Sequence, residues 1–141
     1  SFLAPNMLLT PHIIEMSRLI GKDTKYISEH MEEVAKDFSR QNHTNIILKA
    51  HESIIACVDE SVYLSNFGSS AMAKGGSGDI LTGVIAGLSA LNFDIIKAAR
   101  YACLIHGSSG SMASKIKGEH GVLARDIIEC IPEVMKDYML S

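Results

Sequence analysis

The chain has 141 residues, of which 47% are hydrophobic and 21% are charged, so it has the size and composition of one globular domain. Its 13 Lys and Arg residues against 16 Asp and Glu residues give a net charge of −3, which excludes a nucleic-acid-binding protein that works through a basic face. The apolar stretch over residues 80–93 is shorter than the ~20 residues of a membrane span and is interrupted by Gly83 and Gly87. We therefore expect no nucleic-acid partner and no membrane segment.

The first third of the sequence combines a short apolar run with helical patterns. Residues 7–9 predict a strand, and Thr10 and Pro11 predict the N-cap and the first residue of a helix. The spacing of apolar residues predicts helices over residues 11–20 and 25–41. Since the chain begins almost directly with an apolar strand, we expect it to be part of a longer chain.

The middle of the sequence predicts strands, and the last part predicts helices. Strands are expected over residues 45–48, 53–58 and 62–65, the last two forming a hairpin. After a Gly- and Ser-rich stretch, helical segments are expected over residues 79–91, 94–116, 124–130 and 132–139. Strands mixed with helices on this scale indicate an α/β layered domain, which we expect to span residues 1–141 without an internal boundary.

The three cysteines, Cys57, Cys103 and Cys130, are far apart and form no C-x-x-C pair. Disulfide frameworks and zinc sites usually need closer or even-numbered cysteines. We therefore expect three buried thiols in a cytoplasmic protein.

The most specific motif is a glycine-rich loop, Gly75-Gly76-Ser77-Gly78, followed by Asp79 at the predicted start of a helix. Glycines let a backbone approach a ligand closely, and the N–H groups at a helix start attract anions. The motif therefore predicts a site that binds phosphate or stabilises a developing negative charge. Asp79 would repel a phosphate unless it had a chemical task such as that of a general base. The alternative is a helix cap preceded by a flexible loop, because the motif is neither a Walker A loop nor a dinucleotide fingerprint.

A second candidate group follows the first predicted strand. His12 and Glu15 are three residues apart, so a helix places them on one face, at the end of a strand where α/β sheets bind ligands. The alternative is that both residues only stabilise the start of the helix. His106, next to Gly107 in a predicted helix, is expected to be packed or hydrogen-bonded rather than catalytic.

These motifs together resemble one family. Residues 75–83 (GGSGDILTG), the segment Thr10-Pro11-His12-x-x-Glu15 and the closing residues 121–132 are similar to the nucleotide-dependent NAD(P)H-hydrate dehydratases of the ribokinase-like superfamily. The similarity covers essentially the whole chain but only about the C-terminal half of the family's domain. It implies a three-layer α/β/α sandwich, of which this chain carries the C-terminal portion of the sheet and its flanking helices.

The resemblance also implies roles for individual residues. Asp79 would be the catalytic base and, with His12, would contact the hydrated dinucleotide substrate. The anion hole for the transferred phosphate would be formed by Gly75, Gly76, Ser77 and Gly78. The nucleotide would be bound by Gly78 and by the segment Lys49, Ala50, His51, Glu52 and Ser53, in which Ala50 and Ser53 replace the family's Gly and Thr. Mg²⁺ would accompany the nucleotide, with Glu15 as a ligand through water, and Lys74 stands where the family has Thr.

The implied reaction is metabolite repair by a lyase. ATP or ADP phosphorylates the hydroxyl of hydrated NADH or NADPH, and loss of phosphate restores NADH or NADPH. The partners would be this dinucleotide and the nucleotide, and the protein would be a homo-oligomer. Two other functions stay open on the sequence alone: a ribokinase-like kinase of a small alcohol or vitamin precursor, and an inactive nucleotide-binding fragment.

Overall fold

A computed structural model of the chain describes residues 3–66 and 75–139. The chain divides into two compact units, residues 1–66 and 67–141. Most of the predicted Gly- and Ser-rich stretch, including Lys74, lies outside the described residues. None of the helices in the described ranges is long and apolar enough to cross a membrane.

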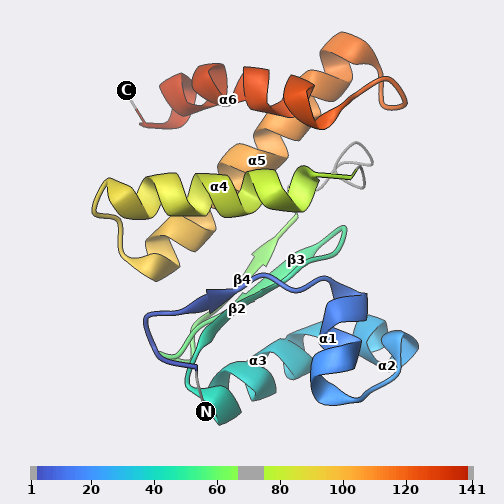
Figure 1. Ribbon diagram of the computed structural model, residues 1–141, viewed down its shortest axis with the longest axis vertical. Helices are drawn as coiled ribbons and strands as arrows, with labels where there is room; N and C mark the ends of the chain where they lie inside the picture. Colours follow the sequence, from blue (N-terminus) through green and yellow to red (C-terminus); the bar gives the residue numbers. More distant parts are fainter. Residues whose placement is uncertain (1–2, 67–74, 140–141) are drawn as a thin grey trace. The chain divides into compact units, whose positions relative to one another are not determined.

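The first unit is a mixed four-stranded sheet with three helices (Figure 1). Its elements are, in chain order, β1 (Leu8–Leu9), α1 (Ile13–Ile20), α2 (Thr24–Glu29), α3 (Met31–Asn42), β2 (Asn45–Leu48), β3 (Ser53–Ala56) and β4 (Val62–Ser65). The strands lie in the order β1-β2-β3-β4. β1 and β2 are parallel, whereas β2, β3 and β4 form antiparallel pairs, so the predicted hairpin of the last two strands is confirmed.

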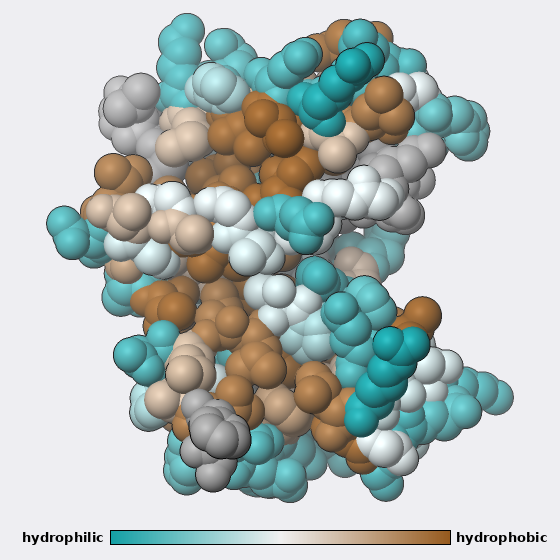
Figure 2. Space-filling model, viewed as in Figure 1, coloured by the Kyte–Doolittle hydropathy of each residue, from teal (hydrophilic) through white to brown (hydrophobic). Residues whose placement is uncertain are grey.

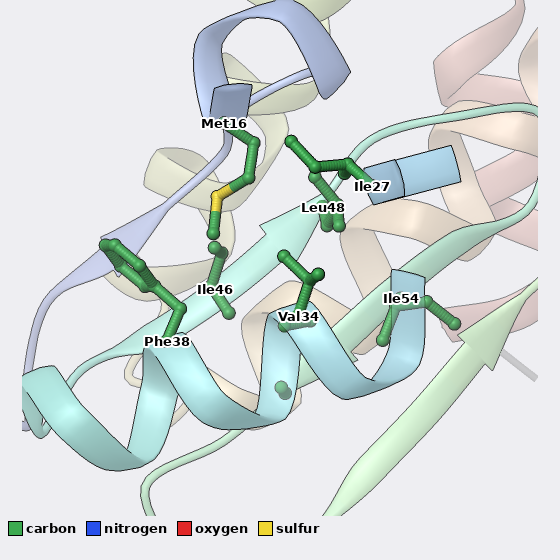
Figure 3. Close-up of a cluster of buried hydrophobic side chains, with 9 residues drawn as sticks. Met16, Ile27, Val34, Phe38, Ile46, Leu48 and Ile54 are labelled. Carbon is green, nitrogen blue, oxygen red and sulfur yellow. The ribbon is translucent and has the colours of Figure 1, made fainter. Parts of the chain in front are cut away.

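The hydrophobic core of this unit lies between its helices and one face of the sheet (Figure 3). Side chains of a strand alternate between the two faces, and the register places Ile46, Leu48 and Ile54 on the same face. Met16 of α1 and Ile27 of α2 pack against them and are fully buried. The cluster is completed by Val34, Ala35, Phe38 and Ala56. Fully burying one large apolar side chain contributes about 1.5–3 kcal/mol, so this cluster is the main stabilising feature of the unit.

Helix α1 begins two residues later than its spacing predicts. The backbone stays extended through Pro11, whose carbonyl accepts a hydrogen bond from the Lys49 N–H at 2.8 Å. His12 then forms a parallel bridge with Lys49 and is the N-cap of α1. The prediction of Thr10 as the N-cap was wrong, because pairing with a distant part of the chain keeps Pro11 out of the helix.

The predicted helix over residues 25–41 is two helices, α2 and α3, with His30 between them. The His30 ring donates from Nδ1 to the Tyr26 carbonyl at 2.8 Å and stacks on the Tyr26 ring. In a continuous helix the His30 N–H would bond to that carbonyl, but it bonds to the Ile27 carbonyl at 3.2 Å instead. The His30 ring thus takes the place of the His30 N–H at the Tyr26 carbonyl, and α2 ends there.

The second unit, over its described residues, consists of α4 (Ser77–Ala90), α5 (Ile95–Lys117) and α6 (Ala124–Met139) (Figure 1). Helix α4 begins two residues before its predicted start. Gly76, at φ +87°, is its N-cap and accepts the Ile80 N–H at 3.2 Å. Only glycine adopts this backbone conformation without strain, so the glycine itself sets where α4 begins.

Helix α6 continues through Pro132, where two separate segments were predicted. Its buried residues Ile127, Cys130 and Val134 lie on both sides of the proline at helical spacing. An internal proline costs about 3 kcal/mol, which burial of this continuous stripe offsets. The three cysteines, all of them among the described residues, are buried and form no disulfide, as predicted.

Candidate functional site

The glycine loop leads into the start of α4, which has backbone N–H donors that the helix itself does not use. Helix geometry leaves the N–H groups of Ser77, Gly78 and Asp79 without partners inside the helix. Among the residues that the structure describes, no side chain caps this helix end. These donors and the positive end of the helix dipole therefore point to one place, an arrangement that fits an anion.

Asp79 is the third residue of α4, not the first as predicted, and it is exposed. A carboxylate in the first turn stabilises a helix by about 0.3–1 kcal/mol through the dipole. Because its side chain does not cap the helix, its oxygens are accessible to a ligand held by the neighbouring N–H groups. This geometry suits a base that takes a proton beside a bound phosphate.

Behind the loop, a buried hydrogen bond joins α4 to α5. Ser77 Oγ and His106 Nε2 lie 3.0 Å apart, and the two residues are only 3% and 6% exposed. The prediction that His106 is a packed, hydrogen-bonded residue is confirmed.

Gly76 and Asp79 also lie at one end of an apolar groove between α4 and α6, with a volume of about 730 Å³. Figure 2 shows apolar side chains gathered between these two helices. The other lining residues are Ile80, Gly83, Val84, Gly87 and Leu88 of α4, its C-cap Leu91, and Ala124, Ile128, Ile131 and Met135 of α6. The sequence patterns described above do not predict this groove. Two features of α4 in the sequence point to it: the helix has almost no charged residue, and it carries two glycines four residues apart on an exposed face.

The groove glycines lead to a prediction about stability. A Cβ added at Gly87 meets no atom within 4 Å, and alanine is a better helix former than glycine. We expect Gly87→Ala to raise the free energy of unfolding by about 0.5–1 kcal/mol, measured by urea denaturation followed by circular dichroism. Gly76→Ala is the contrasting variant, since a side chain is strained at φ +87° and its Cβ would lie 3.4 Å from Ala124. It should lower the same quantity by about 1–2 kcal/mol, and two effects of the same sign would contradict the prediction.

In the first unit, His12 and Glu15 form a capping box at the start of α1. His12 Nδ1 accepts the Glu15 N–H at 3.1 Å, and Glu15 Oε2 accepts the His12 N–H at 2.8 Å. The pair thus stabilises the start of α1. Both side chains remain about half exposed, at 48% and 49%, so capping leaves them accessible to a ligand.

The predicted nucleotide segment adjoins His12. Lys49 pairs with His12 in a parallel bridge, and the residues after it form the turn from β2 to β3. Ser53 Oγ accepts the Ala50 N–H at 3.3 Å and closes this turn, while His51 and Glu52 are exposed. The fold therefore brings His12, Glu15 and the segment 49–53 together in the first unit, and places the glycine loop and Asp79 in the second.

The capping box makes a pH-dependent contribution to stability. The hydrogen bond from the His12 N–H holds the pKa of Glu15 below its ordinary value, helped by the charges of His12, Lys49 and Arg18 and opposed by desolvation. A depressed folded-state pKa adds stability above the unfolded-state pKa, and that stability is lost as the pH falls through the folded-state value. We therefore expect the stability difference between the wild type and Glu15→Gln to be full at pH ~6 and to shrink below pH ~4.5, in urea denaturation across this range. A difference that does not change with pH would contradict the assignment.

A bound metal was expected near Glu15. Within residues 3–66 and 75–139, no group of three or more His, Cys, Asp or Glu side chains is placed to hold a metal ion. A single exposed carboxylate is still a donor of the type that Mg²⁺ prefers. Glu15 as a ligand through water stays a prediction.

The chain matches a family model described as NAD(P)H-hydrate dehydratase over residues 3–133. It is 35% identical over 131 residues to the bifunctional NAD(P)H-hydrate repair enzyme Nnr of Moorella thermoacetica. It is 33% identical over 132 residues to the ADP-dependent (S)-NAD(P)H-hydrate dehydratase of Bacillus subtilis. These matches cover 93% and 94% of this chain but 25% and 48% of the relatives, so the chain spans about half or less of their length.

Solved structures of the same family and superfamily also match this chain. The ADP/ATP-dependent NAD(P)H-hydrate dehydratase of B. subtilis, co-crystallized with ATP/Mg²⁺, matches with a TM-score of 0.89 at 33% identity, covering 92% of this chain and 47% of that chain. A ribokinase-like superfamily protein of Enterococcus faecalis matches with a TM-score of 0.83 at 27% identity, covering 96% and 45%. The predicted α/β, ribokinase-like fold is confirmed. The chain belongs to the NAD(P)H-hydrate dehydratase family, as its glycine loop and its Thr10-Pro11-His12-x-x-Glu15 segment predict.

Proposed function

We propose that the protein containing this chain is a lyase of metabolite repair, which dehydrates hydrated NADH or NADPH with ATP or ADP as the phosphoryl donor. We also propose that residues 1–141 are the C-terminal part of a single ribokinase-like domain. The observation that carries the function is the start of α4, where N–H donors without partners inside the helix adjoin the exposed carboxylate of Asp79. Membership of the family supports it.

The glycine loop provides the anion hole in this proposal. The backbone of Gly75, Gly76, Ser77 and Gly78 surrounds the transferred phosphate, and Gly78 also contacts the nucleotide. Donors that are fixed before the reaction stabilise the charge that builds up on the phosphate oxygens without having to reorganise. This is why the loop is followed at once by a helix, whose dipole adds to the same field.

Asp79 acts as the base. It takes the proton of the substrate hydroxyl while that oxygen forms a bond to the terminal phosphorus of ATP or ADP. The bond from this phosphorus to its bridging oxygen breaks at the same time, and ADP or AMP leaves. The carbon–oxygen bond then breaks, phosphate leaves with the bonding electrons, and the neighbouring ring carbon loses a proton to restore the double bond. His12 contacts the hydrated dinucleotide and orients it for these steps.

The turn after β2 binds the nucleotide in this proposal, through Lys49, Ala50, His51, Glu52 and Ser53. Lys49 supplies a positive charge, and the exposed backbone of the turn supplies hydrogen-bond partners. Mg²⁺, when bound, neutralises the nucleotide phosphates, and Glu15 would hold it through a water.

The test is a turnover assay with NADPH hydrate, Mg²⁺ and either ADP or ATP, run on this chain and on the complete gene product that contains it. The return of reduced-nicotinamide absorbance and the release of phosphate are followed together. We expect both signals in equal amounts with the complete product. A stable phosphorylated alcohol without phosphate release would indicate a kinase instead, and no turnover by a folded, complete product would indicate an inactive nucleotide-binding protein.

A further inference from the structure

The hydrogen bond between Ser77 and His106 has no role in the steps above. We infer that His106 is a positioning residue, which holds the anion hole in place through the Ser77 hydroxyl. This inference rests on the proposed function, because it assigns a role at the same phosphate site.

The bond ties the first residue of α4 to the interior of the neighbouring helix. Ser77 Oγ lies 3.0 Å from His106 Nε2, and the two residues are 29 positions apart in the sequence. Both residues are almost fully buried. In such surroundings water does not compete for the hydrogen bond, so the bond restrains the two groups more firmly than it would at the surface.

The loop needs a restraint of this kind. Ser77 follows two glycines, the residue type with the greatest backbone freedom, and in the described residues no side chain caps α4. The Ser77 N–H belongs to the proposed anion hole. Because a bond that holds the Ser77 side chain also restrains the backbone of this residue, it fixes the direction of the N–H group. Misplacing a positioned group by about 1 Å can reduce a rate by about a hundredfold.

Helix α5 also contains a matched control. Ser109 lies one turn beyond His106, is fully buried, and its Oγ has no hydrogen-bond partner in the described part of the chain. Ser77→Ala and Ser109→Ala therefore remove the same hydroxyl from equally buried positions, but only the first breaks the bond to His106. Removing an unpaired buried hydroxyl should leave kinetics and folding nearly unchanged.

The experiment compares His106→Leu, His106→Gln, Ser77→Ala, the double variant His106→Leu/Ser77→Ala and Ser109→Ala in the complete gene product, with NADPH hydrate as the substrate. Rates are normalised to the folded fraction measured by circular dichroism.

We expect His106→Leu and Ser77→Ala each to lower kcat between about tenfold and a hundredfold, with the KM for NADPH hydrate unchanged. His106→Gln keeps an amide near the Nε2 position, which can donate through its nitrogen or accept through its oxygen, and should recover most of the rate. The double variant should be no slower than the slower single variant, because both single variants break the same hydrogen bond.

A second measurement does not depend on turnover. Hydrogen exchange of the Ile80 amide, whose N–H bonds to the Gly76 carbonyl and closes the first turn of α4, should be faster in His106→Leu than in the wild type. It should be unchanged in His106→Gln and Ser109→Ala. Unchanged kcat and unchanged exchange in His106→Leu would overturn the inference, as would multiplying losses in the double variant. Failure of the wild type to turn over NADPH hydrate would instead count against the proposed function, and the exchange result alone would then decide whether His106 positions the loop.

Discussion

Replacing Asp79 by asparagine is expected to lower the turnover of NADPH hydrate by at least about 100-fold in the complete protein. Asparagine has nearly the same shape but cannot take a proton from the substrate hydroxyl. Because Asp79 is exposed and does not cap α4, the change should cost the fold no more than the dipole contribution of about 0.3–1 kcal/mol. Affinity for ADP, measured by calorimetry, should remain largely intact.

The matched control for this variant is Asp94→Asn. Asp94 also lies at a helix start in the second unit, where its Oδ1 accepts the Lys97 N–H at 2.9 Å and caps α5. Asparagine caps a helix as well as aspartate does, so this variant should keep wild-type turnover. Near-normal turnover by Asp79→Asn would rule out the carboxylate as the base, whereas equal losses in both variants would point to a general effect of charge.

The largest expected effect on stability comes from Asn45→Leu. Asn45 is fully buried in β2 and holds three backbone groups: its Nδ2 donates to the carbonyls of Pro5 and Met7 at 2.8 and 3.0 Å, and its Oδ1 accepts the Val58 N–H at 3.1 Å. A leucine side chain fills the space but bonds to none of them. The Met7 carbonyl keeps the backbone N–H of residue 45 at 3.2 Å, so the Pro5 carbonyl and the Val58 N–H are the two groups that lose this partner. Leaving a fully buried polar group unpaired costs about 1–3 kcal/mol. These two bonds are part-buried, so we expect about 1–2 kcal/mol for each and a fall of about 2–4 kcal/mol in the free energy of unfolding.

Asn42→Ala is the control for this measurement. Its Nδ2 also donates to a carbonyl, that of Phe38 at 3.0 Å, but within a single helix turn near the surface. We expect a change within about 0.5 kcal/mol. Urea denaturation of both variants by circular dichroism tests the comparison, and a loss at position 45 no larger than that at position 42 would show that the three bonds of Asn45 add little.

Local chemistry made several parts of the structure predictable. The strands over 45–48 and 62–65 are found where their apolar residues predict them. Helix α5 begins after Asp94 because that side chain satisfies a free backbone N–H, an interaction within one turn. The glycine loop before a helix is likewise a short-range pattern, and it made the anion site and Asp79 the first candidates for function.

Interactions between distant residues decided the remainder. Pairing of His12 with Lys49 makes α1 begin two residues later than its sequence pattern predicts. Burial of apolar residues on both sides of Pro132 lets α6 continue through this proline. The role of Asn45 depends on carbonyls about 40 positions away. Sequence alone therefore determined the element types, the family and the chemical motifs, because these depend on neighbours within one turn or strand. Only the tertiary structure decided the start of α1, the continuation of α6 through Pro132, the α4–α6 groove and the Ser77–His106 bond. Each of these needs residues that come together only when the chain is folded.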